Sequence, residues 1–201
     1  MRKETYLFPV YLKLTGRRCL VVGAGEVSEG KVAGLIRAGA KVEVVAPRAT
    51  PQIKKWHQQK KLYWHRREFR PGDLAAAVLV VAATDSPKLH KQIFREARAR
   101  EVLCNIVDVP PLCDFYYPAV VRRGNLQIAI STGGSSPSLA KRLREEMETH
   151  FGPEYEAWLR SLSRKRQKIL GKSMSLSERR DALKEQASAR AFAQFLKAHR
   201  K

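Results

Sequence analysis

One carboxylate interrupts an apolar stretch of the chain, NIVDVPPLCDFYYPA, which runs from Asn105 to Ala119. This carboxylate, Asp108, is followed by a valine and two prolines. Burying an unpaired carboxylate within a strand is costly or shifts its pKa, so we expect Asp108 at the end of a strand. Two interpretations are open: Asp108 is a solvated turn residue, or it is an acid or base at the mouth of a site.

A glycine-rich segment near the N-terminus has the spacing G-x-G-x-x-small and runs from Gly23 through Ala24 and Gly25 to Ser28. In this pattern the first glycine allows a tight turn and the second lets the backbone approach a pyrophosphate at a helix N-terminus. The last position must be small so that helix and strand can pack. The segment predicts a dinucleotide site, and a tight turn without a ligand is the alternative.

Other candidates follow the ends of further apolar runs. In a dinucleotide site of this kind, an acid at the end of the second strand binds the adenosine ribose. This chain lacks that acid and has Ala46 there, followed by Pro47 and Arg48. Backbone groups near Pro47 can hold the ribose, and Arg48 can accept a 2′-phosphate, so the residues leave NAD and NADP open. Thr84 and Asp85 end the next run, where they face a cofactor or, in the case of Asp85 or Ser86, cap a helix. Asn105 and Asp108 end the last run, on the nicotinamide side.

A second loop, STGGSSPS, precedes a helical segment. It contains Ser131, Thr132, Gly133, Gly134 and Ser135. Free N–H groups at a helix N-terminus attract phosphate or carboxylate, and a flexible hinge is the alternative.

The elements that must position these residues alternate between strands and helices up to residue 110. The sequence predicts strands at 18–23, 41–47, 75–84 and 102–109, and helices at about 24–39 and 87–100. In the first helix, Val27, Lys31, Leu35 and Ala38 are expected near one face, and Gly39 ends it. This alternation predicts an α/β fold with a parallel sheet.

The pattern changes after residue 110. Two strands around a turn at 123–125 precede a helix that begins at Ser136 and Pro137, and the remainder is predicted to be helical, with a capping box over 175–178.

The composition limits the function classes. The 201 residues are 44% apolar, which excludes a disordered chain. The net charge of +20 suggests nucleic acid, but the charge is spread along the chain, with 13 of the 39 Lys and Arg in residues 151–201. The cysteine and histidine spacing predicts no metal site, and Cys19 and Cys104 are expected to be buried. With neither a signal-peptide pattern nor a long apolar run, we expect a cytoplasmic protein without a membrane span.

Four segments, taken together, resemble the precorrin-2 dehydrogenases, which are the siroheme-synthase N-terminal module and its stand-alone homologues. These segments are FPVYLKLTGRRCLVVGAGEVSEGKV, VVAATD, CNIVDVP and ISTGGSSPSLAKRLREE, in the family's order and spacing. The resemblance covers about residues 6–150. It implies a Rossmann-type NAD-binding domain (1–113), a small α+β dimerisation segment (114–150) and a C-terminal helical domain (151–201), assembled as a homodimer.

The resemblance also implies an activity, namely NAD-dependent oxidation of precorrin-2 to sirohydrochlorin, to which some members add insertion of ferrous iron. It makes Asp108 the catalytic residue and favours NAD. It adds Glu26, Val27, Pro47 and Arg48 as cofactor contacts. The loop at 131–137 would face the tetrapyrrole. A departure from the family pattern is Ser28, which replaces the usual alanine.

Two other functions are compatible with parts of this sequence. A non-enzymatic NAD sensor needs the glycine loop but neither Asp108 nor the second loop. A nucleic-acid-binding protein would show a steep dependence of affinity on salt. We expect neither nucleic acid nor a membrane as a partner, because the diffuse positive charge suits a small substrate with many carboxylates.

Overall fold

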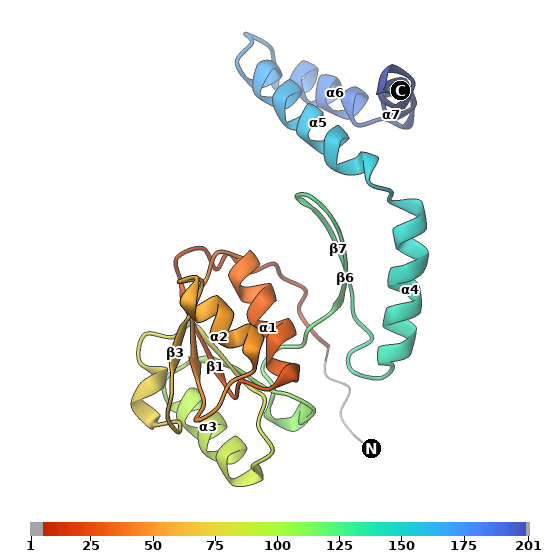
Figure 1. The fold of residues 1–201 in the computed structure, drawn as a ribbon. Helices are drawn as coiled ribbons and strands as arrows, with labels where there is room; N and C mark the ends of the chain where they lie inside the picture. Colours follow the sequence, from red (N-terminus) through yellow and green to blue (C-terminus); the bar gives the residue numbers. More distant parts are fainter. Residues whose placement is uncertain (1–5, 200–201) are drawn as a thin grey trace. The chain divides into compact units, whose positions relative to one another are not determined.

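The computed structural model describes residues 6–199, which form two compact units, one up to Tyr116 and one from Tyr117 (Figure 1). Residues 1–5 lie outside this range, and they belong to the N-terminal segment in which no signal peptide is predicted. The further separation of residues 114–150 from residues 151–201 stays a prediction.

The first unit has a five-stranded parallel sheet in the order β3-β2-β1-β4-β5, which confirms the predicted α/β class. Its strands are β1 (Arg18–Val22), β2 (Lys41–Val45), β3 (Tyr63–His65), β4 (Leu79–Ala82) and β5 (Leu103–Ile106), and its helices are α1 (Glu26–Arg37), α2 (Pro51–Gln58) and α3 (Pro87–Ala99). Because β2 and β4 lie on opposite sides of β1, the chain changes direction between β1 and β4. Ligands of such sheets bind at this switch point.

Helices cover both faces of the sheet, as buried parallel strands require (Figure 1). On one face, Val32 and Leu35 of α1 and Ile53 of α2 pack against alternate residues of β1 and β2. On the other face, Ile93 and Ala97 of α3 pack against the intervening residues. The alternation along each strand therefore fixes which helix lies on which face.

The structure corrects the predicted inner face of the first helix. Its buried residues are Ser28, Val32 and Leu35, whereas Val27 is 59% exposed and Ala38 is also exposed. The helix ends as predicted near Gly39, which has φ of +74°. The N–H of Gly39 donates to Ile36 O and that of Ala40 to Leu35 O, which is the bonding of a Schellman ending.

Sequence analysis missed α2 and β3. The N-terminus of α2 has a recognisable cap, since Thr50 accepts a hydrogen bond from Ile53 N and Pro51 follows it. The strand β3 is three residues long and pairs only with β2 at the edge of the sheet. Such a short edge strand leaves no periodic pattern to detect.

The second unit contains an antiparallel pair, β6 (Ala119–Arg123) and β7 (Leu126–Ile130), followed by four helices. These helices are α4 (Pro137–His150), α5 (Glu154–Leu170), α6 (Leu176–Gln186) and α7 (Ala189–His199). The predicted N-cap of α4 is confirmed, because Ser136 accepts a hydrogen bond from Leu139 N. The capping box of Ser175 and Glu178 at α6 is confirmed as well.

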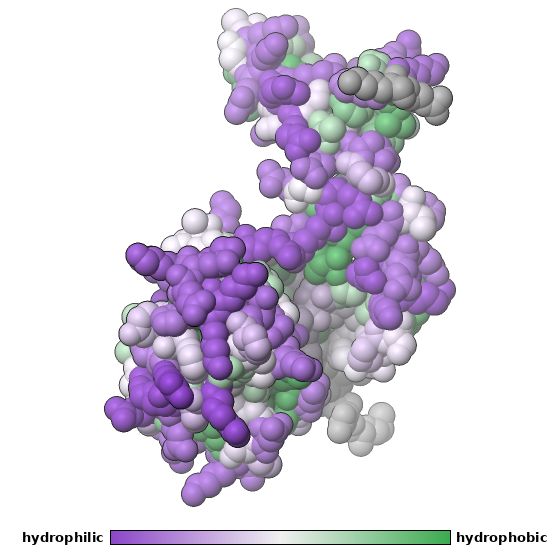
Figure 2. Space-filling model, viewed as in Figure 1, coloured by the Kyte–Doolittle hydropathy of each residue, from purple (hydrophilic) through white to green (hydrophobic). Residues whose placement is uncertain are grey.

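Most of the surface visible in Figure 2 is hydrophilic, as expected of a chain with a net charge of +20. None of the helices in residues 6–199 combines the length and the apolar character needed to cross a bilayer. Cys19 and Cys104 are fully buried, as predicted. Burial raises the pKa of the Cys19 thiol to about 11 and that of Cys104 to about 12, so both act as small apolar residues.

A group of charged side chains links β1 and β2 to the edge strand β3. Glu43 of β2 accepts hydrogen bonds from Arg18 Nε at 2.5 Å and Arg18 Nη2 at 2.8 Å, and His65 Nε2 lies 2.7 Å away. The bonds from Arg18, followed by that from His65, lower the pKa of Glu43 from 4.5 to about 2.

Replacing Glu43 by Gln should reduce the free energy of unfolding by about 1–3 kcal/mol at pH 7, because Arg18 loses its charged partner. The contribution of a carboxylate with a lowered pKa is present above pH 4.5 and is lost as the pH falls towards 2. The difference between variant and wild type should therefore shrink over this interval in urea titrations. A Glu68→Gln control should stay within about 0.5 kcal/mol at all pH values. Equal stability of Glu43→Gln and wild type at pH 7 would contradict the account.

Candidate functional site

The glycine loop begins where the ends of β1 and β4 come closest. Gly23 has φ of +99°, and a Cβ placed on it would lie 2.0 Å from Ala83 O. No residue other than glycine fits there. The N–H of Gly23 donates to Val45 O at 3.0 Å, which also ties the loop to β2.

The next glycine opens the space in front of α1. Gly25 is the N-cap residue, and a Cβ placed on it would meet nothing within 4 Å. No side chain caps the first turn of α1, so backbone N–H groups there remain for an anion. The carboxylates of Glu26 and Glu29 in this turn also favour the positive end of the helix.

Two buried hydroxyl groups near this loop have no hydrogen-bond partner, namely those of Ser28 and Thr84. A buried hydroxyl without a partner costs free energy unless a ligand or water satisfies it. The backbone O of Thr84 is already used, since it accepts a hydrogen bond from His90 Nε2 at 2.7 Å. The open space at Gly25 and these unsatisfied hydroxyls fit a dinucleotide.

A cavity of about 420 Å³, here called the sheet-edge cavity, lies over the carboxyl ends of β1, β2 and β4. It brings together three residues predicted to bind the cofactor, Gly23, Pro47 and Thr84. Phe69 and Leu89 supply apolar walls that sequence analysis did not find. The side chain that caps α3 is Ser86 rather than Asp85, and Ser86 also lines this cavity.

Asp108 lies in a turn directly after β5, where Val109 N donates to Ile106 O at 3.1 Å. It is exposed and has φ of +61°, a conformation that aspartate tolerates better than most residues. Asp108 was expected at the carboxyl end of a strand over 102–109, but β5 ends at Ile106 and Asp108 lies two residues beyond it. Its position as a turn residue is confirmed, and its role as an acid or base stays a prediction.

Lys31 of α1 is electrostatically coupled to Asp108. Burial lowers the pKa of the Lys31 ammonium, and the charge of Asp108 opposes this change. Sequence analysis placed Lys31 near the inner face of the helix, but it did not connect it with Asp108. A lysine on the predicted inner face of a helix is the signal that could have suggested a nearby carboxylate as its partner.

Asn105 has a structural partner. Its side chain is buried, and Nδ2 donates to Phe115 O at 2.7 Å and to Cys113 Sγ at 3.5 Å. These bonds hold the segment after β5 against the end of the strand. The additional contact between Asn105 and a cofactor stays a prediction.

The second predicted loop belongs to the other unit. Residues 131–135 follow β7 and are mostly exposed. Gly133 and Gly134 have φ of +61° and +85°, and Gly133 N donates to Ser131 Oγ at 3.2 Å. Thr132 Oγ1 donates to Ser136 O and accepts from Ser136 N, each at 3.1 Å. The loop is thus ordered by its own hydroxyls, and its contact with a substrate stays a prediction.

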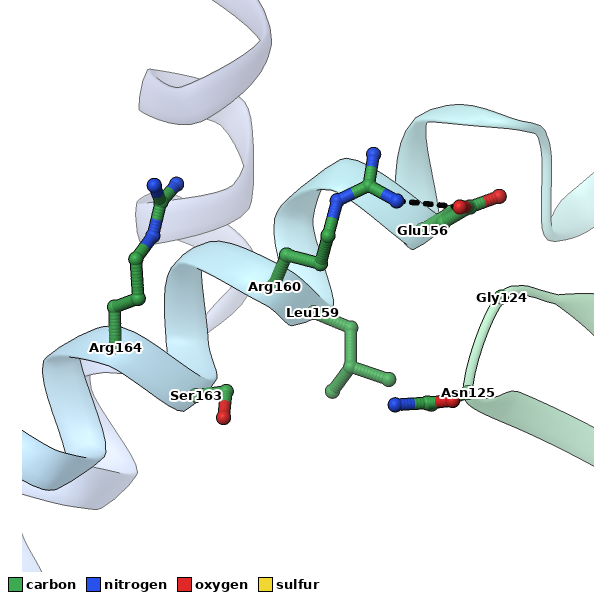
Figure 3. Close-up of a pocket in the computed structure, with 7 residues that line it drawn as sticks. All are labelled: Gly124, Asn125, Glu156, Leu159, Arg160, Ser163 and Arg164. Atoms are coloured by element: carbon green, nitrogen blue, oxygen red, sulfur yellow. Dashed lines mark hydrogen bonds and ion pairs between the residues drawn. The ribbon is translucent and has the colours of Figure 1, made fainter.

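The second unit also has a cavity of about 560 Å³ between the β6–β7 turn and α5 (Figure 3). Asn125 lies on the turn side, and Leu159 and Ser163 face it from the helix. Arg160 forms an ion pair with Glu156 one turn earlier. This cavity holds none of the residues predicted for the site.

Family comparisons agree with this geometry. Residues 10–119 match a family described as putative NAD(P)-binding, and residues 123–150 match the central region of sirohaem biosynthesis proteins. A siroheme synthase of Nitrosococcus oceani is 39% identical over 81% of this chain and 36% of its own length. Siroheme synthase 1 of Cronobacter sakazakii is 45% identical over 70% of this chain and 30% of its own length. The chain thus spans about a third of these relatives.

A solved structure of similar length, described as SirC, precorrin-2 dehydrogenase, has a TM-score of 0.78 and 28% sequence identity. The match covers 96% of this chain and 98% of that one. The fold and the glycine loop define a dinucleotide-binding protein. The chain belongs to the family described as putative NAD(P)-binding, and its similarity to sirohaem biosynthesis proteins and to SirC confirms the resemblance and the cofactor class.

Replacing Lys31 by Met should raise the free energy of unfolding at pH 7 by up to about 1 kcal/mol, because a buried charge is removed. The pKa of Lys31 is lowered in the folded state, so its cost is present at neutral pH and disappears as the pH approaches 10.5. Urea titrations at pH 7 and pH 10 measure this difference. The exposed Lys91→Met is the control and should change little. A loss of stability in Lys31→Met would mean that attraction to Asp108 exceeds the cost of burial.

Proposed function

We propose that this chain oxidises precorrin-2 to sirohydrochlorin with a nicotinamide dinucleotide as the hydride acceptor. The observation that carries the proposal is the similarity to SirC, because it extends over nearly the whole of both chains. The siroheme synthases support the same reaction class, although this chain matches only a third of their length.

The residues of the first unit suit the binding step. Gly23, Ala24 and Gly25 would hold the pyrophosphate with backbone groups, together with Glu26 and Val27 at the start of α1. An exposed valine at a helix N-terminus is available for an apolar contact with the cofactor. Residues of the sheet-edge cavity, including Pro47 and Thr84, would surround the adenosine half.

Asp108 would perform the proton transfer. A bound dinucleotide supplies the acceptor for the hydride, and the substrate must also lose a proton when it is oxidised. Asp108 is exposed at the carboxyl end of β5 and can accept that proton directly or through one water. Lys31 would act as a positioning residue, since its ammonium attracts the carboxylate and restrains it at this edge of the sheet.

The substrate carries many carboxylates, which the net charge of +20 would attract. Ser131, Thr132, Gly133, Gly134 and Ser135 would contact it through hydroxyl and backbone groups of their exposed loop. We further propose a homodimer, which is what the resemblance to the precorrin-2 dehydrogenases implies. A cytoplasmic location stays a prediction from the N-terminal sequence.

The Asp108→Asn variant tests the proposal. Asparagine adopts positive φ at least as readily as aspartate, so the turn should form as before. The rate of precorrin-2 oxidation, followed by absorbance, should fall by about 10²–10⁴-fold, while dinucleotide affinity should change little. The control is Glu101→Gln, another exposed acid with positive φ, which lies before β5 and should retain full activity.

A normal rate in Asp108→Asn would exclude the proton-transfer role. A wild-type protein that binds the dinucleotide but never oxidises precorrin-2 would instead support the non-enzymatic sensor.

A further inference from the structure

The chain folds back on itself directly after β5. Asn105 pairs with Cys113 in an isolated antiparallel bridge, and Asp114 N donates to Cys104 O at 2.7 Å. Residues 107–112 between these contacts form a closed loop, here called the Asp108 loop. Because β5 lies at the edge of the sheet, the returning segment 113–115 also pairs with backbone groups that an edge strand would otherwise expose.

Side chains join the two ends of the Asp108 loop as well. Asn105 is buried, and its Nδ2 donates to Phe115 O at 2.7 Å and to Cys113 Sγ at 3.5 Å. Asp114 Oδ2 accepts a hydrogen bond from Cys104 N at 2.9 Å. A buried amide and a carboxylate thus hold the returning segment against the strand, in addition to the backbone contacts.

The thiol of Cys113 reaches across the turn that carries Asp108. Its Sγ donates to Ile106 O at 3.1 Å and also reaches Val109 O at 3.4 Å. Ile106 and Val109 are the first and last residues of this turn, which Val109 N closes by donating to Ile106 O at 3.1 Å. Burial raises the pKa of the Cys113 thiol, and the charge of Asp114 adds to this change. The thiol therefore keeps, at neutral pH, the proton that it donates.

The turn leaves the side chain of Asp108 facing outwards between two anchored neighbours. Val107 packs against the apolar cluster that includes α1, and Val109 packs against the cluster that includes α3. Asp108 itself is exposed and has φ of +61°. A residue keeps such a sparsely populated backbone conformation when the surrounding structure restrains it. Hydrogen bonds at both ends of the turn provide a restraint of this kind.

The restraint matters because proton transfer depends on placement. A base must come within hydrogen-bond reach of the proton that it accepts, directly or through one water. A displacement of about 1 Å can lower a rate by about 10²-fold. A carboxylate on an unrestrained loop would lose conformational entropy each time it adopted the productive position.

We propose that Asn105 and Cys113 are positioning residues, which fix the Asp108 loop and thereby place the Asp108 carboxylate for proton transfer. The inference rests on the proposed function for the role of Asp108. Neither positioning residue has to contact the substrate or the cofactor. If the returning segment only covered the edge of the sheet, loss of either side chain would affect stability without acting through Asp108.

Steady-state rates of the full chain test this inference. The variants Asn105→Ala and Cys113→Ala should each lower kcat for precorrin-2 oxidation by about tenfold and change KM for NAD by less than about twofold. Cys113→Ser retains a donor and should recover most of the lost rate. The control is Cys19→Ala, which removes a fully buried side chain near the amino end of β1. It should lower the melting temperature but retain kcat.

Double variants separate positioning from a general loss of structure. Because Asn105 and Cys113 act through Asp108, Asn105→Ala or Cys113→Ala should cause no further loss of rate in an Asp108→Asn protein. A general structural defect would lower the rate by the same factor with and without the Asp108 carboxylate. Equal factors in the two backgrounds, or full rates in both single variants, would overturn the inference.

Amide hydrogen exchange at Val109, followed by nuclear magnetic resonance, tests the restraint without any substrate. Exchange of this N–H should be at least about fivefold faster in Asn105→Ala and Cys113→Ala than in the wild type, and unchanged in Cys19→Ala. A wild type that never oxidises precorrin-2 would reject the proposed function, while faster exchange in the variants would still support the restraint of the loop. An active wild type with unchanged exchange in both variants would retain the proposed function and reject the positioning residues.

Discussion

The close approach of β1 and β4 is the constraint on which the rest of the site depends. The turn after β1 passes so near Ala83 O that only glycine fits at position 23. This turn sends the chain directly into α1 and leaves the first turn of that helix facing open space at Gly25. The same turn brings Thr84 to the sheet-edge cavity with a buried hydroxyl that no protein group satisfies. The tight contact at Gly23 thus shapes the glycine loop and leaves polar groups beside it without a protein partner.

The acidic residues of the first unit fall into paired, more buried ones and exposed ones. The chain has 39 basic and 19 acidic residues, and in the first unit the more buried acids are used to hold the fold. Glu43, Asp73 and Asp114 are each paired with an arginine. Asp108 differs, because its turn leaves it exposed at the carboxyl edge of the sheet. Its charge attracts the Lys31 ammonium, whose pKa is lowered by burial. An edge that carries exposed cations and an accessible carboxylate next to the last strand suits anionic ligands and proton transfer.

Much of this arrangement could be predicted from local sequence. Apolar runs that end in Gly23, Ala46, Thr84 and Asp108 defined four strands and the edge at which their carboxyl ends meet. Glycine spacing and capping residues are read within a few positions, because the backbone conformations that they permit are local. The positions of β1, β2, β4 and β5 along the chain, the helix caps and the burial of the two cysteines were therefore predicted correctly, although β4 and β5 are shorter than predicted.

The remainder depends on contacts between distant segments. The edge strand β3 has no pattern of its own, and only its pairing with β2 brings Trp64 to the carbonyl of Ala46. Lys31 and Asp108 lie 77 positions apart, and only the packing of α1 near the end of β5 couples them. The hydrogen bond from the amide of Asn105 to Phe115 O also joins distant positions, and the sequence did not reveal it. The inner face of α1 was misplaced because Ser28, a polar residue, is buried there.

We infer that the backbone at the start of α1 holds the phosphates of a dinucleotide. The decisive measurement is the calorimetric affinity for NAD of a Gly25→Ala variant, together with the melting temperature of that variant. A methyl group at this position meets no protein atom and requires no strained backbone, so the melting temperature should not change. It would, however, occupy the space through which a pyrophosphate must approach, and the affinity should fall by at least about tenfold. Undiminished NAD binding by a stable Gly25→Ala protein would contradict the account.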